Sequence, residues 1–560
     1  MVKDKIVENL FLSLKKFGHL DAEIDLQPPT NSAHGDYSTS VALKLTKQLK
    51  KNPMEIAEEI KKNLPKTDFI EKIEVVKPGF INFWISDDYF LDYARKASEE
   101  KFDFPAFHLG KNKKIMVEFA HPNTHKLFHI GHLRNISTGE AIVRIFSAVG
   151  NKVVPVNYQG DVGLHIAKCL YGIRQSGADW KKFKTPKEKI EFIGKMYTEG
   201  TQAYEKNEKA KEEILEINEM IYNESPEIIP LWKETRQWSL DYFGEVYKRV
   251  SSRFDRFYFE SEFYKRGLEI CKKALNDGVL EKSQGAIVFN GKKYGLDTRV
   301  FINSKGFPTY EGKELALAEK EFSEFGELDH NIHVVTPEQT SFFKVTFKVQ
   351  ELLDGKKYKN KQYHLIYEWV KLKTGKMSSR EGNVIEGNWL IDQIKEKILK
   401  QFKGDEKTAE TLAVASVKYS FLKQGTDSPI AFDIDESVAV DGNSAPYLIY
   451  TYVRCQSVLK KASVSPDTAV IDAGVDELNI LRKLYQFSEV VLKAAENYSP
   501  SLIANYLYEL SSQFNLFYQK NPILKAEEKT RELRLLITKA TAKVIKKGLE
   551  LLGIITVEKM

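Results

Sequence analysis

Apolar and polar positions follow different patterns along the chain, which predicts three parts. Residues 1 to about 105 begin with helical spacing and continue with β-branched and aromatic residues in IEVVKPGFINFWI (73–85). This mixture predicts a small α+β domain. From about 395 onwards the spacing is helical, and it predicts an all-α helical-bundle domain. One apolar stripe there steps by 4, 3, 4 and 3 positions through Ile503, Leu507, Leu510, Phe514 and Phe517.

The middle part begins with a strand–helix–strand pattern. KKIMVEF (113–119) has apolar residues at alternating positions, as in a strand, and KVVPVNY (152–158) is typical of a second strand. A helix is predicted between them, from about His132 to Gly150, because apolar residues recur on one side and glycine commonly ends helices. Such a βαβ unit builds a parallel sheet, and ligands bind at the carboxyl ends of its strands.

Long insertions are expected to interrupt this sheet. A charged, helical and aromatic-rich segment follows at about 166–250, a strand-like stretch at 285–302, and HVV (333–335) resumes the sheet. The fold class is therefore multidomain α/β. We expect an N-terminal α+β domain (1–105), a Rossmann-like parallel-sheet domain (106–395) with helical and β insertions at about 166–250 and 266–307, and an all-α domain (396–560).

Composition narrows the class of protein. The 560 residues are 42% hydrophobic and 29% charged, which excludes a disordered or fibrous chain, and the net charge of +6 does not indicate a nucleic-acid binder. Cys169, Cys271 and Cys455 are far apart, so neither a disulfide framework nor a thiolate zinc site is expected. No apolar run approaches the roughly 18 residues of a membrane span, and the N-terminus does not resemble a signal peptide. These features predict a cytoplasmic enzyme without membrane contact.

The loop after the first strand carries the first candidate for chemistry. In AHPNTHKLFHIGHLRN (120–135), His129, Gly131 and His132 form H-x-G-H at the start of the predicted helix. Free backbone N–H groups and the helix dipole favour phosphate there, both imidazoles can donate to it, and Lys126 adds positive charge. Gly131 lacks a Cβ and would let a flat base approach. The alternative is a chance cluster of histidines.

A second candidate lies downstream. KLKTGKMSSREGNVI (371–385) contains Lys376, Met377, Ser378 and Ser379. A lysine in a glycine-flanked, hydroxyl-rich loop can reach a polyphosphate and stabilise charge that develops in a transition state. Alone, the segment could be an ordinary basic surface loop. Its position after H-x-G-H favours the catalytic interpretation.

H-x-G-H followed by K-M-S-S resembles the paired motif of class I aminoacyl-tRNA synthetases. VEFAHPNTHKLFHIGHLRN (117–135) is similar to the arginyl members, and the likeness covers nearly the whole chain in order. The other matching segments are HGDYSTSVALKL (34–45) and KPGFINFWI (77–85) for the N-terminal domain, VNYQGDVG (156–163) and VVTPEQTSFFK (334–344) for the catalytic core, and DGNSAPYLIYTYVR (441–454) and GLELLGIITVEKM (548–560) for the anticodon-binding domain.

The resemblance implies arginine–tRNA ligase activity. Arginine and ATP would form arginyl-adenylate and pyrophosphate, and arginine would then pass to the 3′ end of tRNA(Arg) in protein synthesis. His129, His132, Lys376 and Lys126 would be catalytic through positioning and electrostatics, without a protein nucleophile. His129, Gly131, His132 and Lys376–Ser379 would bind ATP. Mg²⁺ would accompany the ATP, with no zinc and no protein-bound metal.

For arginine, the resemblance implies carboxylates that meet a planar guanidinium. Glu118 would be one and Glu314 another, with the ring of Tyr310 one helical turn away and beside the guanidinium. Asn123 would hold the amino-acid backbone, and Gln339 would complete the pocket. The alternatives are solvated surface carboxylates and a core tyrosine.

Three departures from the family pattern concern this pocket. Glu314 stands where aspartate is usual, which lengthens the side chain by one methylene. Ala120 and His121 replace two small hydroxyl-bearing residues, and DVGLHIAK (161–168) lacks the usual Trp and Gln. They affect the detail of the pocket and not the class of reaction.

The resemblance also implies tRNA contacts at both ends of the chain. Phe80 and Asn82 would bind the dihydrouridine loop of the tRNA elbow by stacking and edge recognition, unless Phe80 is a core residue. Tyr447, Tyr450 and Arg454 lie at i, i+3 and i+7, where they would contact the anticodon stem or pack internally. Arginine, ATP and tRNA(Arg) are the expected partners of a monomer, and the low net charge fits if Lys and Arg gather on one face.

The residues also bear on two kinds of alternative protein. A cysteinyl synthetase would need a thiolate zinc site, which three separated cysteines cannot supply, and a glutamyl pocket would need arginine rather than paired carboxylates. A non-catalytic, synthetase-like RNA-binding protein would be expected to have lost motif residues. Both motifs are intact in this chain.

Overall fold

The computed structural model describes residues 1–16, 18, 22–29, 31–99, 112–373, 385–401, 404–462 and 473–560. The chain divides into two compact units. One comprises Met1–Phe107, Thr451–Val490 and Tyr506–Lys547, and the other comprises His108–Tyr450, Val491–Asn505 and Gly548–Met560.

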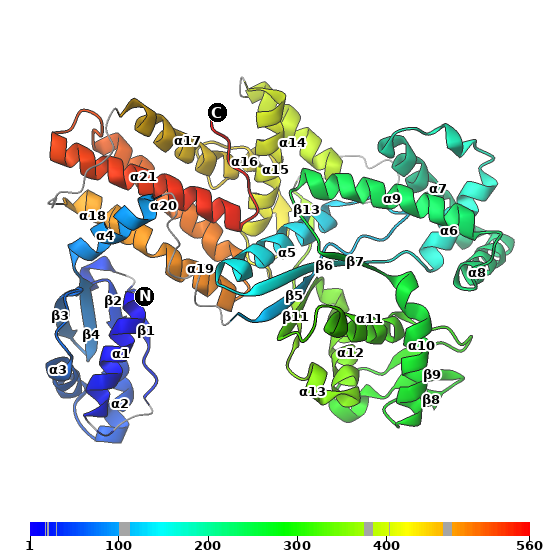
Figure 1. Cartoon of the computed structure of the whole chain (residues 1–560), viewed down its shortest axis with the longest axis horizontal. Helices are drawn as coiled ribbons and strands as arrows, with labels where there is room; N and C mark the ends of the chain where they lie inside the picture. The colour runs from blue at the N-terminus through cyan, green and yellow to red at the C-terminus, as the bar shows by residue number, and fades with distance from the viewer. Residues whose placement is uncertain are drawn as a thin grey trace. The chain divides into compact units, whose positions relative to one another are not determined.

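The first unit contains a small antiparallel sheet. Its strands are β1 (Leu26–Gln27), β2 (Tyr37–Thr39), β3 (Ile70–Val76) and β4 (Phe80–Ile85), in the order β1-β2-β4-β3. The helices of this region are α1 (Val2–Lys15), α2 (Val41–Leu49), α3 (Pro53–Asn63) and α4 (Asp87–Ser98), drawn in blue in Figure 1. Gly79, in the turn from β3 to β4, has a φ of 144°, and a Cβ there would lie 2.9 Å from that of Pro53. The predicted α+β domain is confirmed.

The second unit is built on a five-stranded parallel sheet. The strands β5 (Lys114–Glu118), β6 (Lys152–Gln159), β7 (Arg256–Phe259), β11 (His330–Val335) and β12 (Gln362–Ile366) lie in the order β12-β11-β5-β6-β7. Three of these strands, β5, β6 and β11, were predicted from the apolar pattern. β7 and β12 were not, because each is short and has no clear alternation.

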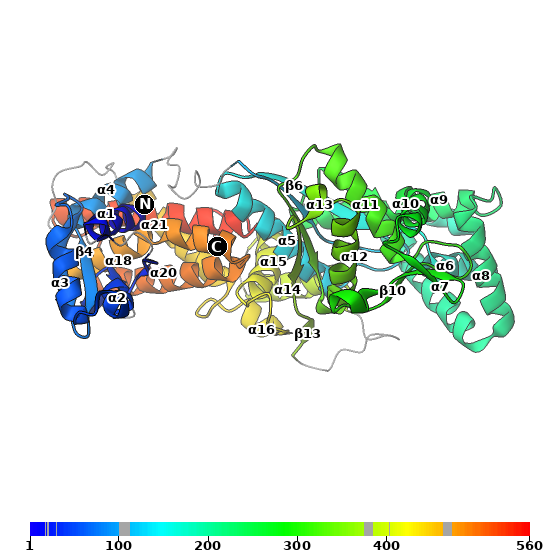
Figure 2. The ribbon, with the colours of Figure 1, turned by 90° about the horizontal axis from the view of Figure 1, so that it is seen from below.

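Helices cover both faces of this sheet. α5 (Ile130–Ala148) lies on one face, and α11 (Tyr310–Glu324) and α12 (Thr340–Leu353) lie on the other (Figures 1 and 2). Side-chain alternation explains the arrangement, since successive residues of a strand point to opposite faces. Phe119 packs against Gly139 of α5, whereas Met116 packs with Leu317 of α11. Glu118 is therefore expected on the α11 face.

The insertions lie between strands of the sheet. Between β6 and β7 are α6 (Leu164–Gln175), α7 (Pro186–Lys206), α8 (Glu208–Tyr222) and α9 (Ile229–Arg249). After β7 come α10 (Glu260–Asn276) and an antiparallel sheet in the order β10-β9-β8, formed by β8 (Glu281–Ser283), β9 (Ala286–Phe289) and β10 (Arg299–Ile302).

The remainder of the chain is mostly helical, as predicted. Its helices are α13 (Gly355–Tyr358), α14 (Gly387–Gln401), α15 (Glu406–Leu422), α16 (Ile434–Ser437), α17 (Ala445–Lys461), α18 (Val475–Tyr485), α19 (Phe487–Glu496), α20 (Pro500–Lys520) and α21 (Glu528–Leu551). The apolar stripe of α20 is buried. Two short strands, β13 (Val370–Leu372) and β14 (Ile430–Phe432), pair in parallel, and neither is predicted by the sequence because each is too short for a periodic pattern. Among the described residues, no helix is long and apolar enough to cross a membrane.

Candidate active site

The carboxyl ends of neighbouring strands gather the candidate residues at one edge of the parallel sheet. Glu118 ends β5, Gly160 follows β6, Glu260 follows β7, and Thr336 follows β11. β6 and β7 lie on one side of β5, and β11 and β12 lie on the other, so the strand order reverses beside β5. Open α/β sheets bind ligands in the crevice at such a point.

H-x-G-H forms the first turn of α5. His129 is the N-cap, and its Nδ1 accepts the backbone N–H of His132 at 3.4 Å, while the Nδ1 of His132 accepts the backbone N–H of His129 at 3.1 Å. The two rings stack with centroids 3.6 Å apart. A Cβ on Gly131 would lie 3.0 Å from the His129 ring, so glycine keeps this stack unhindered. Because both Nδ1 atoms are acceptors, each neutral ring carries its proton on Nε2.

The environment keeps both imidazoles neutral. Burial, with a smaller contribution from Lys126, lowers the pKa of His129 to about 4. Burial also lowers the pKa of His132 well below its ordinary value, with His129 adding to the effect. The Nζ of Lys126 lies 5.1 Å from the centroid of the Tyr197 ring. Two neutral N–H donors and a lysine at a helix N-terminus suit a polyphosphate.

The residues of K-M-S-S, Lys376 to Ser379, lie outside the described residues. Residues 385 and 387, which follow this motif, form main-chain hydrogen bonds with residues beside H-x-G-H. The backbone N–H of Ile130 donates to the Ile385 carbonyl at 2.9 Å, and the N–H of Gly387 donates to the Phe128 carbonyl at 2.8 Å. Main-chain hydrogen bonds therefore join residues 385 and 387 to the H-x-G-H turn.

Arg134 connects α5 to the strand that precedes K-M-S-S. It is 1% exposed. Its Nη1 donates to the carbonyl of Trp369 at 2.9 Å, and its Nη2 donates to the carbonyl of Ser428 at 2.8 Å, so it holds the starts of β13 and β14. Burial lowers the pKa of Arg134 to about 10, which leaves the guanidinium charged at neutral pH.

Glu118 and Glu314 are both buried on the α11 face of the sheet. The Oε1 of Glu118 lies 3.4 Å from the Nδ1 of His333, its register partner on β11. Burial opposes ionisation, but His333 outweighs it and lowers the pKa of Glu118 to about 2. Glu314 of α11 has an Oε1 without a hydrogen-bond partner in the described part of the chain, and burial raises its pKa to about 8. An anionic and an unpaired carboxyl group together suit a guanidinium.

Tyr310 and Glu314 lie in different surroundings, although α11 places them one turn apart. Tyr310 is 57% exposed, whereas Glu314 is 3% exposed. Beside Tyr310, Lys313 donates to Glu260 Oε2 at 2.7 Å in a buried ion pair, and the Lys313 Nζ lies 4.7 Å from the Tyr310 ring centroid. The charge of Glu260 and burial raise the pKa of Tyr310 to about 12. The sequence did not point to Glu260 or Lys313, and recognising β7 would have revealed Glu260 at a strand end.

Asn123 lies in the loop after β5, which packs against the loop after β6. A Cβ on Gly160 would lie 2.2 Å from Asn123 Oδ1, and the N–H of Thr124 donates to the Gly160 carbonyl at 2.9 Å. Asn123 is thus held at the edge where the strands end. Gln339 is exposed, in the turn Pro337–Gln339 that follows β11.

The residues expected to contact tRNA differ in accessibility. Phe80 is exposed at the start of β4, as a stacking residue would be. Asn82 is 1% exposed, and its Oδ1 accepts from Ser38 Oγ at 2.7 Å, which argues against the direct base contact expected of it. Asn82 pairs in register with Ser38 of β2 and Glu74 of β3, whereas Phe80 has no partner on β2.

Three residues of α17 share its less buried side. Tyr447 and Arg454 are partly exposed, and Tyr450 is exposed, whereas Leu448 and Tyr452 are buried. Arg454 also donates from Nη1 to Asn515 Oδ1 at 2.6 Å. The spacing therefore predicts the face correctly, and Arg454 combines a surface position with an internal hydrogen bond.

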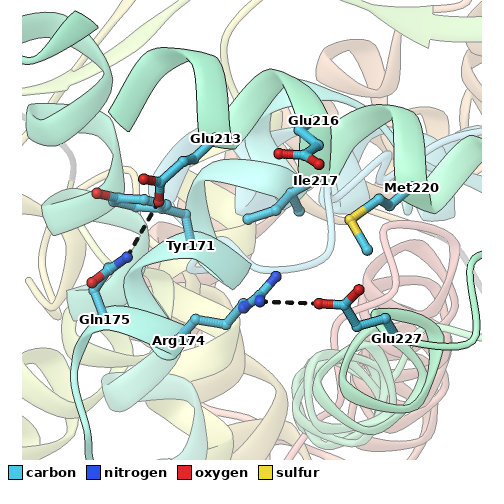
Figure 3. A pocket seen from close by; sticks show the side chains of 8 residues that line it. All are labelled: Tyr171, Arg174, Gln175, Glu213, Glu216, Ile217, Met220 and Glu227. Atoms are coloured by element: carbon cyan, nitrogen blue, oxygen red, sulfur yellow. Dashed lines mark hydrogen bonds and ion pairs between the residues drawn. The ribbon is translucent and has the colours of Figure 1, made fainter. Parts of the chain in front are cut away.

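A separate pocket of about 250 Å³ lies in the helical insertion, between α6 and α8 (Figure 3). Among the residues that line it, Arg174 forms an ion pair with Glu227 at 3.2 Å, and Gln175 donates a hydrogen bond to Glu213 at 3.5 Å. None of the predicted site residues lines this pocket. It is therefore not part of the candidate active site.

Comparisons with known protein families match the chain in three consecutive segments. The arginyl-tRNA synthetase N-terminal domain matches residues 3–85, the catalytic domain of class I tRNA synthetases (R) matches residues 98–427, and the DALR anticodon-binding domain matches residues 448–560. The catalytic match alone covers more than half of the chain. The chain belongs to the class I aminoacyl-tRNA synthetases.

Individual relatives narrow the assignment. The chain is 33% identical to the arginine–tRNA ligase of Fusobacterium nucleatum, over 99% of this chain and 98% of the relative. It is 34% identical to that of Bdellovibrio bacteriovorus, over 81% and 80%. Within its class, the chain is a member of the arginine–tRNA ligase family. The arginyl-tRNA synthetase of Thermus thermophilus shares the fold, with a TM-score of 0.83, 24% identity and full coverage of both chains.

Proposed function

We propose that the carboxyl edge of the parallel sheet activates arginine with ATP and then transfers it to the 3′ end of tRNA(Arg). The observation that supports this most is the H-x-G-H turn, in which both Nδ1 atoms are engaged and both Nε2 protons remain as donors. The buried carboxyl pair of Glu118 and Glu314 at the same edge provides the matching site for a guanidinium.

In the activation step, His129 and His132 donate Nε2 protons to the triphosphate, and Gly131 admits the adenine. The arginine carboxylate attacks the α-phosphate, and Lys126 and Lys376 stabilise the charge of the departing pyrophosphate, together with Met377, Ser378 and Ser379 of the same motif. Mg²⁺ would enter with ATP, held mainly by phosphate oxygens. In the described ranges, no three His, Cys, Asp or Glu side chains are grouped to hold a metal ion.

In arginine recognition, Glu118 and Glu314 bind the guanidinium, and Asn123 holds the amino-acid backbone. We place Tyr310 and Gln339 at the approach to the pocket, since both are exposed, Tyr310 at the start of α11 and Gln339 in the turn after β11. Glu314 reaches one methylene further than the aspartate usual in the family. This extra length fits its deeply buried position on α11.

Binding of tRNA involves the ends of the chain. We assign elbow recognition to residues 1–105 through Phe80, with Asn82 supporting that strand from inside, and anticodon-stem contacts to residues 396–560 through Tyr447, Tyr450 and Arg454. Residues 106–395 supply the catalytic domain. We expect a monomer that acts in the cytoplasm, where its family takes part in translation.

Arginine is expected to be the only amino acid that supports exchange of pyrophosphate into ATP, and the exchange is expected to require tRNA as well. The specificity for arginine is expected because two buried carboxyl groups select a cation with a planar fork. The measurement offers each of the twenty amino acids with and without total tRNA. Exchange with any other amino acid would contradict the assigned specificity.

Lys376→Ala is expected to slow adenylate formation about 100-fold and to change arginine affinity little, because its charge acts on developing pyrophosphate. Single-turnover formation of arginyl-adenylate and calorimetric titration of arginine separate the two effects. Lys371→Ala, in the exposed part of β13, is the matched control. A loss confined to arginine affinity would show that Lys376 has another role.

A further inference from the structure

A second layer of side chains surrounds the two pocket carboxyl groups, and His333 is its centre. His333 is fully buried on β11 and packs against the rings of Phe343 and Phe347 from α12. Its Nδ1 faces Glu118 Oε1 at 3.4 Å, and its Nε2 faces Gln362 Oε1 at 2.9 Å. The Gln362 amide nitrogen donates to Gln350 Oε1 at 2.8 Å, which leaves the Gln362 oxygen as an acceptor.

Both ring nitrogens of His333 therefore face acceptors, and a ring that donates from both is an imidazolium. The pKa of His333 is consistent with this charged form. Burial opposes the charge, but Glu118 outweighs it and raises the pKa of His333 to about 9. A buried cation without a partner would be costly, so His333 and Glu118 stabilise each other's charged forms.

Glu321 completes the surroundings of Glu118. It is fully buried on α11, and its Oε2 accepts from Asn331 Nδ2 at 2.8 Å. Burial, with the charge of Glu118, raises the pKa of Glu321 well above its ordinary value. The Oε1 of Glu118 thus faces two imidazole nitrogens, Nδ1 of His333 at 3.4 Å and Nδ1 of His121 at 3.6 Å, while Glu321 is a buried carboxyl group whose raised pKa favours its neutral form.

Glu314 is the remaining carboxyl group. Each of the three carboxyl groups has one buried oxygen without a partner, but Glu118 also faces His333 and Glu321 also accepts from Asn331, whereas Glu314 has no hydrogen bond in the described part of the chain. Burial raises its pKa to about 8, against the opposing effect of His333. α12 presents aromatic rings to this cluster. The other titratable groups that interact electrostatically with Glu314 or His333 are Glu118 from β5, Tyr158 from β6, Glu311 and Glu321 from α11, His330 from β11, His364 from β12, and His121 from the loop after β5.

We propose that His333 is a positioning residue of the arginine site, that it keeps Glu118 ionised and oriented, and that binding of the arginine guanidinium expels a proton from Glu314. This inference rests on the proposed function, because it takes Glu118 and Glu314 as the guanidinium site. Without ligand, the cluster holds one imidazolium, one carboxylate and two neutral acids. With arginine bound, Glu314 becomes a carboxylate paired with the incoming cation, and its proton passes to solvent.

The direction in which arginine affinity changes with pH follows from this release of a proton. Below about pH 8, Glu314 of the free protein is mostly protonated and must lose its proton before it can pair with arginine. Arginine affinity should therefore rise about tenfold per pH unit up to about pH 8 and then level off. A carboxyl group with an ordinary pKa would give no such slope in this range, since it would already be ionised.

The wild-type chain tests the proposal without any substitution. Arginine is titrated calorimetrically at pH 7.0 in phosphate and in Tris, and the difference in apparent enthalpy gives the number of protons released. We expect about one proton, and a dissociation constant that falls between pH 6.5 and 8. Arginine binding without proton release and with a flat pH profile would overturn this inference alone. Absence of any arginine binding, with or without ATP and tRNA, would overturn the proposed function as well.

His333→Gln tests the positioning role. The variant keeps a side chain that can hydrogen-bond to Glu118 but removes the charge, so the apparent pKa that governs arginine affinity should move up by about one pH unit, and affinity at pH 7.5 should fall about tenfold. His330→Gln is the matched control: it lies on the same strand, with its Nε2 2.9 Å from the hydroxyl of Tyr498. A pH profile that moves equally in both variants, or in neither, would show that His333 has only a structural role.

Discussion

Replacing His129 with asparagine is expected to slow formation of arginyl-adenylate about 100-fold while arginine affinity stays nearly unchanged. Asparagine is a good N-cap, so its side-chain oxygen can still accept the backbone N–H of His132 and preserve the first turn of α5. The substitution removes the Nε2 donor that we assign to the triphosphate. Loss of one preorganised donor to a transition state typically costs 10²–10³ in rate, about 3–4 kcal/mol. Single-turnover adenylate formation measures the rate, and calorimetry measures arginine affinity.

Ser147→Ala, near the end of the same helix, is the control for this substitution. Ser147 is exposed and donates only to the carbonyl of Val143 at 2.7 Å, so its loss should leave the rate unchanged. The wild-type rate should also show no titration of His129 between pH 6 and 8, because the pKa of His129 is about 4. A full rate of adenylate formation in His129→Asn would show that its ring does not act on the triphosphate.

Much of the fold could be predicted because its signals are local. The alternation in 113–119 and the helical spacing after His132 each depend on a few consecutive residues. The H-x-G-H turn could also be placed, since a capping arrangement involves neighbours three positions apart. α5 begins at Ile130, two residues before the predicted start, because His129 itself caps the helix.

The second layer of the arginine site could not be predicted, because its contacts depend on strand register. Glu118 and His333 are 215 positions apart and meet only because β5 and β11 pair in parallel with these two residues opposite each other. Glu321 joins them through the packing of α11 on one face of the sheet. The sequence contains no local sign of such a register, so it identifies His333 only as part of a strand.

The burial of Asn82 has a similar origin. The motif KPGFINFWI placed it two residues from Phe80, and alternation alone would give the two side chains the same face. In the sheet, Asn82 pairs in register with Ser38 of β2 and Glu74 of β3, so neighbouring strands cover it on both sides. Phe80 lies at the start of the strand, beyond the end of β2. Exposure was thus decided by the neighbouring strands rather than by the pattern of β4.

Arg134→Met is expected to loosen β13 and β14 by about 3 kcal/mol and to slow adenylate formation at least about tenfold. Methionine fills much of the same space but leaves the carbonyls of Trp369 and Ser428 without their donor, and each unsatisfied buried carbonyl costs about 1–3 kcal/mol. Because β13 leads directly into the segment with Lys376, a looser β13 should position that lysine less well. Hydrogen exchange of peptides covering 366–373 and 426–433 measures the loosening.

Arg144→Met provides the comparison that isolates this effect. Arg144 lies on the same helix, but among the described residues its hydrogen bonds go to Glu140 and to the carbonyls of Ser251 and Glu550, and none goes to β13 or β14. We therefore expect β13 and β14 to exchange at wild-type rates in Arg144→Met and up to about 100-fold faster in Arg134→Met, the factor that corresponds to about 3 kcal/mol. Faster exchange with an unchanged rate of adenylate formation would mean that Arg134 stabilises the strands without positioning the catalytic lysine.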